Sequence, residues 1–76
     1  MPTLTDLADA LFASALQESD RPTPNEVRSV AEQTLRRHGA DCLCRVAQEA
    51  GDHPEEYTRR MRWALREVEG AYGKSA

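Results

Sequence analysis

The stretch LTDLADALFASAL, residues 4–16, decides the fold of this 76-residue chain. Its apolar residues recur at steps of three and four, which predicts one helix over about residues 4–17. From the second turn onward only Asp9 and Ser14 are polar. A helix that is apolar on most sides has to be covered. We therefore expect it to be either the central helix of a bundle or part of an interface with a second copy.

The segment after this helix ends one element and begins the next. The linker ESDRPTPN contains two prolines, which disfavour a continuous helix. Thr23 is a good N-cap, Pro24 suits the first helical position, and Glu26 completes a T-x-x-E capping box. These signals predict a helix over about residues 24–38, with Gly39 as its left-handed terminator.

Two further helices are expected in the second half of the chain, over about residues 41–50 and 54–69, followed by a frayed tail over residues 70–76. Gly51 and the turn GDHP separate the two helices. Short connections make consecutive helices neighbours. The sequence thus predicts a single all-α domain, residues 1–76, built as a compact bundle of four short helices.

The apolar spacing also predicts which sides of the last two helices face the core. The helix over 41–50 is expected to bury Leu43, Val46 and Ala47, with Cys42 as a small apolar filler. The last helix is expected to bury Tyr57, Met61, Ala64, Leu65 and Val68. At about 100° per residue, Trp63 falls on the opposite side of that helix and is expected to face outward.

The stretch RRMRWALR, residues 59–66, holds the only tryptophan among four arginines. Arg59 and Arg66 are the i−4 and i+3 neighbours of Trp63, so both can lie against its indole. An outward aromatic residue among arginines has the composition of an interaction hot spot. The predicted partner-binding residues are therefore Arg59, Arg62, Trp63 and Arg66. The alternative is that a neighbouring helix or the Gly-Ala-Tyr tail covers the tryptophan.

The acidic residues of the last helix bear on this prediction. Glu55 and Glu56 precede Arg59 and Arg60 by four positions, the favourable orientation for ion pairs on a helix. Arg62 and Arg66 lack acidic partners at that spacing. Two unpaired arginines four residues apart repel each other slightly, which favours a role in binding over one in stability.

The composition and charge of the chain favour some classes of function over others. A net charge of −3, a pI near 5.3 and 30% charged residues of both signs are typical of a soluble globular protein and argue against nucleic-acid binding through bulk charge. We expect a non-enzymatic protein–protein interaction or regulatory module, with self-association as one form of that interaction. The alternative is a small DNA-binding transcriptional regulator that uses the arginines of the last helix.

Neither a metal site, a cofactor site nor a catalytic site is predicted. Cys42 and Cys44 point about 200° apart on a helix, so one metal ion does not easily reach both. His38 and His53 are explained by a helix end and a turn. The chain has no stretch apolar enough to span a membrane and no basic start of a signal peptide. Its two closely spaced cysteines fit a reducing cytoplasm.

The pattern ALQxSDxPTPxxV in the first half and GDHPE…RMRWA in the second resembles small uncharacterised all-helical proteins of actinobacteria. The abundance of arginine over lysine and the many alanines agree with a GC-rich bacterial genome. This resemblance spans most of the chain and implies a helical fold, but no activity or site.

Overall fold

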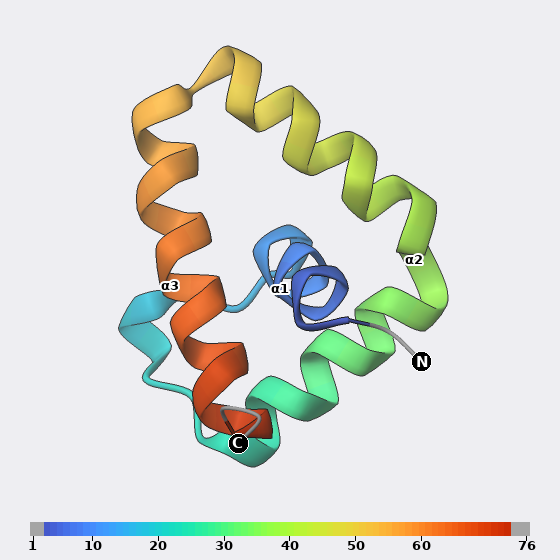
Figure 1. The fold of residues 1–76 in the computed structure, drawn as a ribbon, viewed down its shortest axis with the longest axis vertical. Coiled ribbons are helices and arrows are strands. Elements are labelled where there is room, and N and C mark those ends of the chain that lie inside the picture. Colours follow the sequence, from blue (N-terminus) through green and yellow to red (C-terminus); the bar gives the residue numbers. More distant parts are fainter. Residues whose placement is uncertain (1–2, 74–76) are drawn as a thin grey trace.

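A computed structural model describes residues 3–73, and this part of the chain contains helices and no strand. The helices are α1 (Leu4–Ala13), the short 3₁₀ helix η1 (Glu18–Asp20), α2 (Pro24–Asp52) and α3 (Pro54–Tyr72) (Figure 1). The all-α class is confirmed. Residues 3–73 contain three α-helices, however, where the sequence predicted four.

Helix α1 is the centre of the bundle, with α2 and α3 wrapped around it (Figure 1). Ala8, Ala10 and Leu11 are completely buried although they point to different sides of the helix. This confirms the first of the two expectations for α1. The helix ends at Ala13 instead of residue 17, because Ser14 adopts an extended conformation and its hydroxyl donates to the carbonyl of Leu11.

Capping boxes fix the beginnings of α1 and α2. The backbone N–H of Glu26 donates to the Thr23 hydroxyl, and the N–H of Thr23 donates to the Glu26 carboxylate, both at 3.2 Å. This is the box predicted from the sequence. Thr3 and Asp6 form an equivalent box at the start of α1. Each box satisfies two N–H groups that have no partner inside the helix.

Helix α2 joins the two helices predicted over residues 24–38 and 41–50. Gly39 does not terminate it; the break is reduced to a kink at His38, whose φ of −138° and ψ of 32° are not helical. Helical geometry resumes at once, so the second half of α2 bends around α1 (Figure 1). The predicted separate helix over residues 41–50 is thus the second half of α2, bent at the kink.

Helix α3 continues to Tyr72 and thereby corrects the predicted end at residue 69. Gly73 follows with a positive φ of 77°, a conformation that favours glycine and ends the helix. The predicted frayed tail begins too early, since residues 70–72 are helical. Residues 74–76 of that tail lie outside the described part of the chain.

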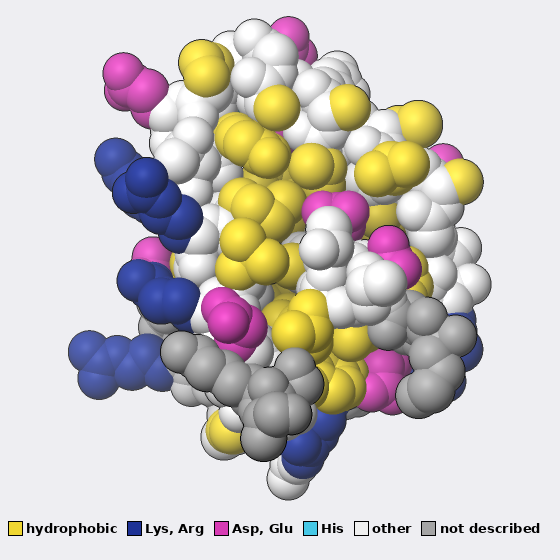
Figure 2. Space-filling view, viewed as in Figure 1, with side chains coloured by type: hydrophobic (Ala, Val, Ile, Leu, Met, Phe, Trp, Pro, Cys, Tyr) yellow, Lys and Arg dark blue, Asp and Glu magenta, His cyan; other side chains and the backbone are white. Residues whose placement is uncertain are grey.

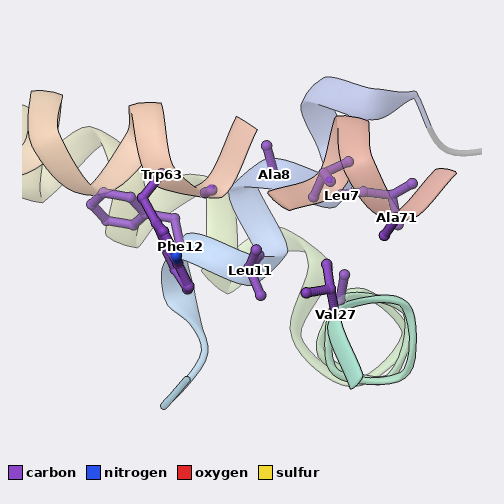
Figure 3. Packing of buried hydrophobic residues seen from close by; sticks show 10 residues of the cluster. Leu7, Ala8, Leu11, Phe12, Val27, Trp63 and Ala71 are labelled. Atoms are coloured by element: carbon purple, nitrogen blue, oxygen red, sulfur yellow. The ribbon is translucent and has the colours of Figure 1, made fainter. Parts of the chain in front are cut away.

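The core combines residues of all three helices (Figure 3). Its buried members are Leu7, Ala8, Leu11, Phe12, Val27, Ala31, Trp63, Ala64, Val68 and Ala71. Two leucines expected in the core lie outside it: Leu43 is 64% exposed and Leu65 is 37% exposed. Beyond its kink, α2 buries only Cys42 fully. The second half of α2 therefore packs loosely against the rest of the bundle.

Candidate functional site: an apolar face edged by arginines

Trp63 is buried, so the predicted outward orientation of its indole is wrong. Its side chain is 3% exposed and lies next to Phe12 of α1 (Figure 3). The helical wheel predicted the wrong orientation because another segment of the chain covers that side of α3. The connection between α1 and α2 crosses it, and Gln17 and Glu18 line a shallow pocket of about 290 Å³ together with Trp63. The alternative of a tryptophan covered by its own chain is correct, although the cover is this connection.

Arg60 holds that connection in place. Its guanidinium donates to the backbone carbonyls of Phe12 at 3.0 Å, Ser14 at 3.0 Å and Leu16 at 2.9 Å. It also lies 5.0 Å from the centroid of the Trp63 ring. Burial lowers the pKa of Arg60 from its usual value. The predicted ion pair with Glu56 does not form, because these carbonyls occupy the guanidinium instead.

Three other arginines form an exposed row along the outer side of α3, which we call the arginine stripe: Arg59, Arg62 and Arg66. Figure 2 shows basic side chains along this outer edge. Arg66 has no acidic partner at the predicted spacing on α3, but it pairs with Glu18 of η1 at 3.5 Å and is therefore not unpaired. Arg59 and Arg62 form no ion pair within residues 3–73. Of the predicted partner-binding residues, the three arginines thus lie together on the surface, whereas Trp63 is buried, with only Arg59 lining the same small pocket.

The exposed apolar residues of α2 lie on one flank of that helix. On the other flank, His38, Asp41 and Arg45 line a pocket with residues 13–16 of the connection. Because successive residues are rotated by about 100°, Leu43 and Ala47 point away from the connection. Both are exposed, and Val46 beside them is partly buried.

The same division holds on α3. Trp63 and Arg59 lie on the flank next to the connection, and at about 100° per residue Leu65 and Met61 lie on the opposite flank. The exposed residues of both helices therefore share the side of the molecule that the connection leaves open. Figure 2 shows hydrophobic side chains gathered there, between α3 and the second half of α2. We call this surface the apolar face: Leu43, Val46, Ala47, Met61 and Leu65.

One partly buried carboxylate of α1 lies near the second half of α2. Asp9 of α1 is partly buried and lies one turn before Ala13, whose backbone carbonyl accepts a hydrogen bond from Arg45 in the second half of α2 at 3.2 Å. Burial, and secondarily the charge of Asp6, raise the pKa of Asp9 itself. No hydrogen bond or ion pair joins its side chain to residues 3–73. Asp9 is thus a partly desolvated carboxylate without a cation.

Cys42 is buried, as the sequence predicted, and Cys44 is exposed. Burial raises the pKa of the Cys42 thiol, which lies 4.0 Å from the carbonyl oxygen of Thr34. Over residues 3–73 no three potential metal ligands come together. The pocket between the connection and the α2 kink has a volume of about 680 Å³ and is widely open. It is lined by charged side chains of both signs, which do not define one kind of ligand.

Comparisons with protein families, with curated proteins and with solved structures find no match for this chain. Function is therefore inferred from the fold and the side chains alone, and the resemblance to actinobacterial proteins stays a prediction. Over the described residues, none of the helices combines the length and the apolar character that crossing a membrane requires.

Proposed function

We propose that this chain is a non-enzymatic protein–protein interaction module that binds its partner through the apolar face and the arginine stripe. The observation that carries the proposal is the exposure of Leu43, 64%, on a helix segment in which only Cys42 is fully buried. Covering a large apolar side chain contributes about 1.5–3 kcal/mol when it is complete. Leu43 and Leu65 thus take the anchoring role first predicted for Trp63.

The arginine stripe supplies the charged edge of the proposed interface. Charges around an apolar centre orient a partner and speed association more than they add affinity. Arg62 lies three residues before Leu65 and is therefore its neighbour on the helix surface. The proposal includes no catalytic residue and no cofactor. It places the chain in a reducing cytoplasm, in keeping with the two free thiols.

Affinity capture with the full chain as bait tests this proposal. We expect a stoichiometric protein partner, which includes a second copy of the chain, to be retained by the native sequence. The variants L43D and L65D should lose it, because each places a charge in the apolar centre. Q48D changes an exposed residue on the other flank of α2 and serves as the matched control. Retention of the partner by both leucine variants, with unchanged helical circular dichroism, contradicts the proposal.

A DNA-binding regulator is the second candidate, and the arginine stripe favours it. Three exposed guanidinium groups on one side of α3 suit phosphate contacts, and α2 and α3 are joined by the single residue His53. The acidic pI opposes this candidate. A mobility shift with duplex DNA that weakens with salt and disappears in an R59A/R62A variant would favour it.

A further inference from the structure

The apolar face and its edge carry charges of both signs that have no partner in the described chain. Asp9 of α1 lies one turn before the contact of Ala13 with the second half of α2, and Arg62 of α3 is the helical neighbour of Leu65. Neither side chain takes part in an ion pair within residues 3–73. A surface with an apolar centre, an acidic side and a basic side can complement itself when one copy is rotated onto the other.

We propose that the partner on the apolar face is a second copy of this chain, bound about a two-fold axis so that Asp9 of each copy meets Arg62 of the other. The inference rests on the proposed function and names its partner. In a two-fold interface the same patch serves both copies, so if one residue meets another, the reverse contact also forms. The pairing of Asp9 with Arg62 therefore occurs twice.

Charge is the reason for preferring a second copy over another occupant. The carboxylate of Asp9 is already partly desolvated, so covering it with an apolar partner alone would add an unpaired buried charge. An incoming guanidinium removes that cost. The chain itself supplies one in Arg62, at the edge of the apolar face beside Leu65. A partner with only acidic residues would pair with the arginine stripe but would repel Asp9.

The packing of α2 points the same way. Beyond the kink, Cys42 is its only fully buried residue, while Leu43 and Ala47 remain exposed. A domain of about 70–80 residues has a core that supplies only about 3–5 kcal/mol, and a second copy is one way to add to it. Apposing two apolar faces covers the second half of α2 in both copies.

A charge swap tests the contact directly. By sedimentation velocity or light scattering, we expect the native full chain to be a dimer and the D9R and R62D variants to have dimer dissociation constants raised at least about tenfold. Each variant alone opposes like charges twice. An equimolar mixture restores an acidic–basic pair at both contacts, so the mixture should form a heterodimer. D41R and R37D, at exposed positions of α2, are the matched controls and should stay dimeric.

The remaining outcomes of these measurements also test the proposed dimer. A native chain that is monomeric at all concentrations overturns the second copy as partner, whereas the affinity capture described above still tests the proposed function with other proteins. A dimer that survives both D9R and R62D overturns the assigned face. If D9R does not fold, as judged by circular dichroism, L43D and L65D replace it because both leucines are exposed. Dimers formed by both leucine variants would overturn the inference.

Discussion

The guanidinium of Arg60 lies 5.0 Å from the ring centroid of Trp63, its neighbour three residues further along α3. The same group donates to carbonyls of Phe12, Ser14 and Leu16, which end α1 and begin the connection to α2. Arg60 thus covers the Trp63 indole and binds the backbone carbonyls at the end of α1, where the chain leaves the helix. Trp63, which the sequence suggested as the anchor of a partner, is thus part of the bundle interior instead.

Replacing Arg60 tests this structural role. R60A leaves three carbonyls without their charged donor, and since hydrogen bonds to charged groups contribute about 1.5–3 kcal/mol, we expect a loss of about 2–3 kcal/mol in the free energy of unfolding. Denaturation by urea measures it. R59A is the matched control at an exposed neighbouring position and should change stability by less than about 0.5 kcal/mol. Equal effects of the two substitutions would contradict the assigned role.

Trp63 provides an optical test of the same region. Because the indole is 3% exposed, its fluorescence should be blue-shifted in the native chain and poorly quenched by iodide or acrylamide. R60A should increase the quenching by loosening the connection. W63A should cost about 3–5 kcal/mol of stability, as is usual for a large buried aromatic residue. A red-shifted, readily quenched native spectrum would show that the connection does not cover the indole.

The sequence predicted the elements better than their faces. The capping box of Thr23 and Glu26 and the apolar run of α1 are local signals, and each is decided by residues within one or two turns. We expected a full break near His38 because Gly39 is a strong helix terminator. The helix continues through a kink instead, because the segments on both sides of the kink pack against the rest of the bundle. Local patterns carry no information about that packing.

Trp63 lies in the core and Leu65 lies outside it, the reverse of the prediction, and this error has a different cause. A helical wheel assumes that one side of a helix is buried, whereas α3 is covered by α1 and by the connection as well. The contacts of Arg60 with α1 and with the connection span 44 to 49 residues, and no spacing in the sequence reports them. The arginine stripe was found correctly as a set of exposed cations, while the apolar face was missed because its leucines fit a core pattern.

The two cysteines should differ strongly in their reaction with a thiol reagent. Cys42 is 2% exposed, and burial raises the pKa of its thiol, so little thiolate is accessible at neutral pH. Cys44 is exposed. We expect one thiol per chain to react rapidly with an aromatic disulfide reagent and the second only on unfolding. C44S should abolish the fast phase and C42S should preserve it; the reverse assignment would contradict the described burial of α2.

Tyr72 links the end of α3 to α2 and should titrate late. Burial and the hydrogen bond that its hydroxyl donates to Glu32 raise the pKa of Tyr72 to about 12 from 10.0. The folded chain therefore holds this proton more tightly than the unfolded chain, and the resulting stability is present below pH 10 and lost as the pH rises toward 12. Phenolate absorbance should show this late titration, absent in Y72F. E32Q should move it to lower pH, and an unmoved titration would exclude the hydrogen bond as a cause.

Asp9 gives a prediction in which stability and binding change in opposite directions. Burial and the nearby charge of Asp6 raise its pKa, so the ionised carboxylate destabilises the folded monomer at neutral pH, and this cost disappears as the pH falls through the raised pKa. D9N removes the charge. At concentrations too low for association, it should raise the melting temperature at pH 7 and have no such effect at acid pH. D41N, at an exposed position, is the control.

The same substitution should weaken the proposed dimer, because Arg62 of the second copy then meets a neutral amide. Thermal unfolding at low concentration and sedimentation at high concentration separate the two effects. A D9N monomer less stable than the native one would mean that the carboxylate already has a favourable partner within its own chain. In that case Asp9 needs no cation from a second copy, and its pairing with Arg62 of that copy loses its physical basis.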